Sequence, residues 1–134
     1  WVEINGRRVQ SVTGGSHWGG GVSISARNQA RIGQMMLDDG MAQGKRVLSA
    51  EWLHQMREPC NIAPYYGYLV WLNHDHKMFP SLPTSSYFGT GAGKSFTWIE
   101  PERRLVVIVR WLESDYADDL FAQILGAIDA SRTN

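Results

Sequence analysis

The stretch "SFTWIEPERRLVVIVRW" (residues 95–111) decides the fold. Aromatic and β-branched residues alternate along residues 95–100, and an apolar run follows over residues 105–109. Between them, Pro101-Glu102-Arg103-Arg104 has the composition of a tight turn. The pattern predicts two antiparallel strands joined by that turn.

The preceding residues, "FGTGAGKSFTW" (88–98), resemble a nucleotide-binding loop in composition only. A phosphate-binding loop requires glycine five positions before Gly93, and Phe88 stands there. It must also open a helix whose amides hold the anion, whereas a strand pattern follows here. We therefore reject a P-loop. The glycines then need another explanation.

The rest of the chain adds a hairpin and helices. "WVEINGRRVQSV" (1–12) alternates around Asn5-Gly6, a strong hairpin signal, and "TGGSHWGGGVS" (13–23) is glycine-rich. Ser25 and Ser49 are placed to cap two helices, the first ending near Gly40 and the second before Pro59.

A third strand and a third helix complete the expected elements. "YYGYLVWLN" (65–73) is aromatic and apolar and predicts a strand. "YADDLFAQILGAIDA" (116–130) predicts an amphipathic helix that lies on the sheet. The expected architecture is α+β: an antiparallel three-stranded meander and an N-terminal hairpin, packed by helices.

The composition limits the functional classes. The chain has 134 residues, is 43% hydrophobic, and balances 13 basic against 13 acidic residues. This balance argues against binding to nucleic acid or a membrane surface through charge. No apolar run is long enough to span a bilayer. Cys60 is the single cysteine, so no internal disulfide can form and the cellular compartment stays open.

The ordered succession of these motifs resembles the C-terminal portion of the serine β-lactamase-like hydrolases. This superfamily includes class C β-lactamases, D-alanyl-D-alanine carboxypeptidases and esterases, and penicillin-binding proteins are similar. Its third motif is a Lys-Thr-Gly or His-Thr-Gly triplet on an edge strand, followed by glycines, a Pro-Glu turn and an apolar strand. Aligned on Pro101-Glu102, the triplet falls on Gly89, Thr90 and Gly91. The resemblance implies a β-lactamase/transpeptidase-like fold and covers nearly all of residues 1–134.

Two catalytic motifs of that superfamily are missing from these residues. No serine is followed by lysine at the third position, so the Ser-x-x-Lys nucleophile is absent. No tyrosine is followed two positions on by asparagine, so the Tyr-x-Asn motif is absent too. In relatives both lie upstream. We therefore expect residues 1–134 to be a single C-terminal segment without the N-terminal catalytic part, and inactive alone.

The resemblance assigns roles to the glycine-rich strand. It implies that the backbone N–H of Ala92, just after the triplet, is an oxyanion-hole donor, with Thr90 also in the catalytic site. Gly89, Gly91 and Gly93 would let the substrate approach the backbone closely. The alternative is that these glycines only permit a bulge at a sheet edge.

Gly89 stands where relatives carry Lys or His. This departure puts β-lactam and D-Ala-D-Ala recognition in doubt and favours an esterase or amidase. Lys94 lies about 17 Å further along an extended strand, too far to replace that side chain, so a solvated lysine is favoured.

Other candidates lie outside the third motif. His17 and Trp18 could contact substrate from the glycine-rich loop, or His17 could be held by the backbone while Trp18 fills the core. His74, Asp75 and His76 are favoured as a solvated loop over a metal site, because adjacent residues rarely converge on one ion. Tyr66, Tyr68 and Trp71 are expected to fill the core.

Two functions remain open from the sequence. One is a fragment of a serine hydrolase acting through an acyl-enzyme on a small ester, amide or peptide, without cofactor or metal. The other is a non-catalytic homologue or binding module with the same sheet. A partial domain should expose apolar surface, so we also expect self-association.

Overall fold

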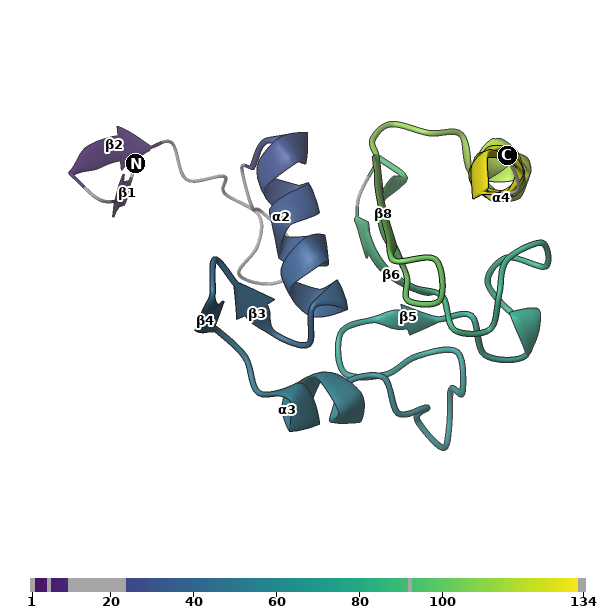
Figure 1. Cartoon of the computed structure of the whole chain (residues 1–134), viewed down its shortest axis with the longest axis horizontal. Coiled ribbons are helices and arrows are strands. Elements are labelled where there is room, and N and C mark those ends of the chain that lie inside the picture. The colour runs from purple at the N-terminus through teal and green to yellow at the C-terminus, as the bar shows by residue number, and fades with distance from the viewer. Residues whose placement is uncertain (1, 5, 10–23, 92, 133–134) are drawn as a thin grey trace.

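A four-stranded antiparallel sheet lies between two helices in the computed structural model (Figure 1). The structure describes residues 2–4, 6–9, 24–91 and 93–132. The α+β class predicted from the sequence is confirmed. No helix in these ranges is long and apolar enough to cross a membrane.

The strands follow one another in chain order, so the sheet is a simple meander. In this order they are β5 (Trp71–Leu72), β6 (Tyr87–Gly91), β7 (Ser95–Glu100) and β8 (Leu105–Val109). The turn between β7 and β8 forms as predicted. In it, the Arg104 N–H donates to the Pro101 carbonyl at 3.1 Å. The fold-deciding stretch is therefore a β-hairpin.

The meander differs from the prediction in two places. It has four strands instead of three, because residues 87–91 form the separate strand β6. The predicted strand at 65–73 shrinks to Trp71–Leu72. The aromatic run turns back on itself, with Leu69 at φ +61° and the Leu72 N–H donating to the Tyr65 carbonyl at 2.8 Å. An extended strand cannot include such a left-handed residue.

One sheet face packs against the C-terminal helix α4 (Ala117–Arg132), as predicted. Phe121 is fully buried, and its ring centroid lies 4.9 Å from that of Trp98. The buried members of this core are Phe79, Leu82, Phe88, Phe96, Trp98, Ala117, Phe121 and Leu125.

Helix α2 (Ala26–Leu37) covers the opposite face. It begins as predicted at Ser25, whose Oγ accepts from the Asn28 N–H at 3.2 Å. A methyl group on Gly33 would lie only 2.6 Å from Val106 Cγ1. Glycine thus sets the close approach of α2 to β8.

The remaining elements are short. Strands β1 (Val2–Ile4) and β2 (Arg7–Val9) form the predicted N-terminal hairpin. Ser49 caps helix α3 (Ala50–Gln55) as predicted, its Oγ accepting from the Trp52 N–H at 3.0 Å. The described residues also form a second hairpin, β3 (Met41–Ala42) with β4 (Lys45–Arg46), and two 3-10 turns, η1 (His74–His76) and η2 (Ser114–Tyr116).

Candidate functional site

The glycine-rich half of β6 lies at an open edge of the sheet. β5 pairs only with Tyr87 and Phe88, and it ends before the glycines. Residues 89–91 pair with β7 on their other side. Among the described residues, no strand covers the remaining edge of this segment. The fold thus presents backbone there, as a third-motif strand requires.

Thr90 turns its backbone polar groups towards that edge. The Asn73 N–H donates to the Ser86 carbonyl at 3.0 Å, so the groups of Ser86 face the β5 side. Backbone groups alternate between the two edges of a strand, which puts those of Phe88 and Thr90 on that side too. Those of Gly89 and Gly91 face β7.

Neither packing nor backbone conformation requires glycine at positions 89 and 91. A Cβ on Gly89 would lie 3.7 Å from Thr97 Cβ, and one on Gly91 would lie 4.0 Å from Ser95 Cβ; both are ordinary contacts. Neither glycine has positive φ. The bare surface they leave beside Thr97 is therefore a feature that the fold of the described residues does not explain.

A polar network flanks this bare surface on the α2 side. Gln29 Nε2 donates to Thr97 Oγ1 at 2.7 Å, and Gln29 Oε1 accepts from Arg110 Nη2 at 2.8 Å. Arg110 Nη2 also donates to the Ile24 carbonyl at 2.6 Å. Nothing in the sequence pattern singled out Gln29, Thr97 or Arg110. The one feature of the sequence that could have pointed to this network was Arg110, at the end of the apolar strand.

At position 93 the fold itself requires glycine. Its φ is +73°, and an added Cβ would lie 2.2 Å from the Trp111 ring. Trp111 is 81% exposed, has φ +60°, and is held beside the turn because the Leu112 N–H donates to the Lys94 carbonyl at 3.3 Å. Left-handed backbone is rare for such a bulky residue and often accompanies a functional site. Trp111 is thus an exposed aromatic beside the glycine strand.

Three of the predicted site residues lie outside the described residues: Ala92, His17 and Trp18. Their roles stay predictions, as do those of Thr90 and the three glycines. Lys94 is exposed and lies in the β6–β7 turn, not on a strand as the sequence suggested.

The histidine-rich loop has local contacts. His74, Asp75 and His76 are exposed; His74 Nε2 lies 3.5 Å from Asp75 Oδ2, and His76 Nδ1 lies 2.8 Å from the Leu82 carbonyl. No group of three metal-ligating side chains forms within the described ranges.

The aromatic run 65–73 divides between core and surface. Tyr66 and Trp71 are half-buried, and their rings meet edge to face at 4.8 Å. Tyr68 is 60% exposed and contacts Trp52 instead, so its prediction as a core residue was wrong. The turn at Leu69 directs Tyr68 outwards.

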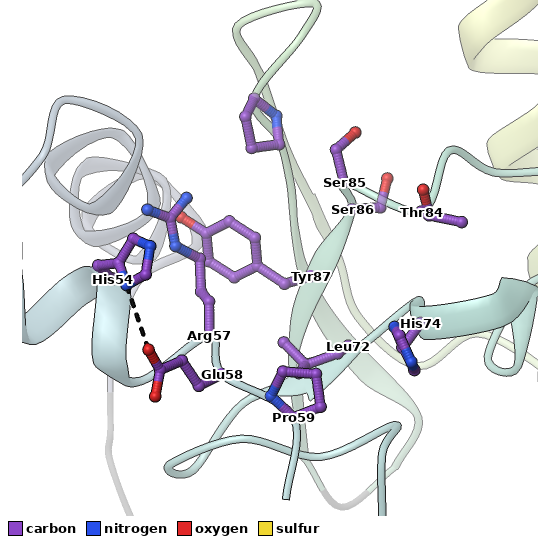
Figure 2. Close-up of a pocket in the computed structure, with 11 residues that line it drawn as sticks. His54, Arg57, Glu58, Pro59, Leu72, His74, Thr84, Ser85, Ser86 and Tyr87 are labelled. Carbon is purple, nitrogen blue, oxygen red and sulfur yellow. Dashed lines mark ion pairs between the residues drawn. The ribbon is translucent and has the colours of Figure 1, made fainter.

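A pocket of about 510 Å³ lies at the opposite end of β6 from the glycines (Figure 2). No residue of the predicted third motif lines it. We therefore keep it apart from the candidate active site. Its lining residues are His54, Arg57, Glu58, Pro59, Leu72, His74, Thr84, Ser85, Ser86, Tyr87 and Pro101.

A fully buried carboxylate lies behind one wall of this pocket. Glu100 accepts from Ser86 Oγ at 2.5 Å and Ser85 Oγ at 3.2 Å, and from the Glu102 N–H at 3.0 Å. Ser86 Oγ in turn accepts from Trp98 Nε1 at 3.0 Å. These hydrogen bonds satisfy the buried polar atoms of the network. They also connect the residues just before β6 to β7.

Comparison with known proteins identifies a partial relative. No model of a known protein family matches the chain. The chain is 40% identical over 60 residues to the 6-aminohexanoate-dimer hydrolase of Paenarthrobacter ureafaciens. The match covers 42% of this chain but 15% of that protein, well under two thirds of its length. The predicted resemblance is thereby confirmed: the chain is partly homologous to the C-terminal portion of a β-lactamase-fold serine hydrolase.

Proposed function

We propose that this chain is the C-terminal part of a serine hydrolase that cleaves a small amide or ester through an acyl-enzyme. Its role would be to supply the third-motif strand, β6, and the amide that receives the substrate carbonyl oxygen. The nucleophile and its base would come from residues outside these 134. The open edge at Gly89–Gly91 carries the proposal, because its glycines have no packing or dihedral reason.

The partial relative favours an amide substrate. That protein is a hydrolase of the 6-aminohexanoate dimer, and two amino acids are joined in a dimer by an amide bond. Gly89 in place of Lys or His points the same way, since a β-lactam or D-Ala-D-Ala carboxylate would lose its usual cationic partner. We therefore place amides first and activated esters second.

In this reaction, the third-motif segment would stabilise the negative charge that develops on the substrate oxygen. The serine hydroxyl attacks the carbonyl carbon, its proton passes to the base, and the carbonyl π electrons move onto oxygen. An N–H that points at this oxyanion stabilises it by about 3–4 kcal/mol. The tetrahedral intermediate then expels the amine, which takes the proton, and water hydrolyses the acyl-enzyme. We assign the donor to Ala92, in line with the family motif.

An activity-probe experiment tests this function. The 134-residue chain and a longer version extended upstream of Trp1 are each incubated with an activated fluorescent ester and a fluorescent penicillin. We expect the ester to label the longer protein only, and the 134-residue chain to take up neither probe. Labelling of the 134-residue chain would overturn the fragment proposal. An upstream region without Ser-x-x-Lys, and without labelling, would instead favour a non-catalytic module.

A further inference from the structure

The pocket at the start of β6 contains a guanidinium without an acidic partner. Arg57 is half-buried, and its Nε donates to the Leu53 carbonyl at 3.0 Å. Its guanidinium carbon lies 5.4 Å from the centre of the Tyr87 ring. Within the described ranges no carboxylate forms an ion pair with it, and no hydrogen bond uses its terminal nitrogens. A half-buried guanidinium whose terminal N–H groups have no protein partner in these ranges can donate to an external anion.

The arginine is held in a fixed orientation. The Nε hydrogen bond fixes one edge of the guanidinium to the end of α3, and the Tyr87 ring supports its face. The two terminal amino groups then form a planar fork, which matches the two oxygens of a carboxylate. A guanidinium fixed in this way loses little side-chain entropy on binding.

The opposite wall disfavours a highly charged anion. Ser85 and Ser86 give their hydroxyl protons to Glu100, so neither hydroxyl has a proton left to donate to an anion in the pocket. Glu58 adds a carboxylate on the arginine side, 3.5 Å from His54 Nδ1 (Figure 2). Repulsion from these acceptors is weaker for a monoanion than for a phosphate dianion.

Part of the pocket lining is apolar. Leu72, Pro59 and Pro101 contribute carbon surface to it. The volume of about 510 Å³ is within the range of small-molecule sites. An alkyl chain of a few carbons would cover the leucine and proline surfaces while its head group reached Arg57.

From this arrangement we propose that the pocket binds a short alkyl monocarboxylate, with its carboxylate on Arg57 and its chain over Leu72. This binding site is separate from the β6 glycine edge and does not depend on the proposed hydrolase function.

The test is an NMR titration of the 134-residue chain with sodium pentanoate. We expect amide shifts at Leu72 and Tyr87 and a Kd on the order of millimolar, as the size of the ligand allows. Pentanamide has the same shape without the charge and should bind at least about tenfold more weakly. Inorganic phosphate should also bind more weakly than pentanoate.

Variants separate the site from general charge effects. Arg57→Met should weaken pentanoate binding at least about tenfold, and Arg57→Lys should weaken it less, because charge remains but the fork is lost. Arg27→Met, which removes an exposed arginine on α2, should leave the affinity unchanged. If Arg57→Met does not fold, the pentanoate affinity of Arg57→Lys alone tests the proposal. Equal binding of pentanamide, tighter binding of phosphate, or unchanged affinity in either Arg57 variant would overturn the proposal.

Discussion

Gly89 and Gly93 lie four residues apart, yet the structure gives them different physical reasons. Gly89 has extended backbone with room for a side chain. Gly93 has φ +73°, and the Trp111 ring occupies the space that a side chain would need. Composition alone could not separate the two, since both belong to one glycine-rich run. The contact that separates them comes from a tryptophan 18 positions after Gly93.

Gly93→Ala should therefore destabilise the fold strongly. Its methyl group would overlap Trp111 in addition to the strain of positive φ, and the two costs together are about 2–4 kcal/mol. Gly44→Ala is the matched control, because Gly44 has φ +74° and nothing within 4 Å of its added Cβ. It should cost only about 1 kcal/mol. Urea unfolding of both variants measures the difference; equal costs would show that Trp111 does not pack on Gly93.

Tyr87 should make the fold sensitive to alkaline pH. Burial raises the pKa of Tyr87 from 10.0 to about 12, and Arg57 acts in the opposite direction. Since the folded pKa is the higher one, the phenol's contribution is complete below pH 10 and is lost as pH rises towards 12. The loss should reach about 1 kcal/mol by pH 11.

Unfolding experiments at several pH values between 9 and 12 measure this effect. Tyr87→Phe should flatten the pH dependence in that range. Tyr116→Phe, at an exposed position, should leave it as in the unmodified chain. A Tyr87→Phe variant with an unchanged alkaline limb would contradict the assignment.

At the scale of elements, two helical glycines should respond in opposite ways to the same substitution. Gly33→Ala on α2 would push a methyl group to 2.6 Å from Val106, and should destabilise by about 1–3 kcal/mol. Gly126→Ala on α4 meets nothing within 4 Å and should stabilise by about 1 kcal/mol through helix propensity. Thermal unfolding compares them. A stabilising Gly33→Ala would mean that α2 does not approach β8 so closely.

Local signals predicted most elements correctly. The caps at Ser25 and Ser49 and the turn at Pro101 each depend on residues within four positions, and all three form as predicted. The predicted strand at 65–73 was too long, because its apolar composition does not reveal the left-handed turn at Leu69 that leaves only Trp71–Leu72 as a strand.

The flanking part of the candidate site could not be predicted in this way. Gln29 meets Thr97 across 68 positions and Arg110 across 81 positions. No spacing rule for single elements connects residues so far apart. The glycine triplet was found only because a family motif marks it, and its role stays a prediction.

At the scale of the whole molecule, the loop that follows α3 carries several exposed apolar side chains. Leu69 is 86% exposed, Ile62 94% and Tyr68 60%. A surface of this kind favours association, either with the rest of a larger protein or with a second copy. Self-association of the 134-residue chain therefore stays our prediction.

Leu69→Asn should weaken that association and also stabilise the monomer. Asparagine tolerates the φ of +61° better than leucine and removes an exposed apolar group. Sedimentation velocity should show a larger monomer fraction for the variant than for the unmodified chain. Val47→Asn, at a 59% exposed position on another loop, is the comparison. A strictly monomeric unmodified chain would refute the prediction.

The assignment of the β6 edge to substrate binding depends on a backbone N–H, which proline removes. In the longer protein, Ala92→Pro should lower the acylation rate with an activated amide or ester by about 10²–10³, the usual effect of losing one oxyanion donor. Ala92→Gly is the control, because glycine removes the methyl group and keeps the backbone N–H. We expect a loss below about tenfold for Ala92→Gly. A folded Ala92→Pro variant that acylates at the unmodified rate would contradict the assignment.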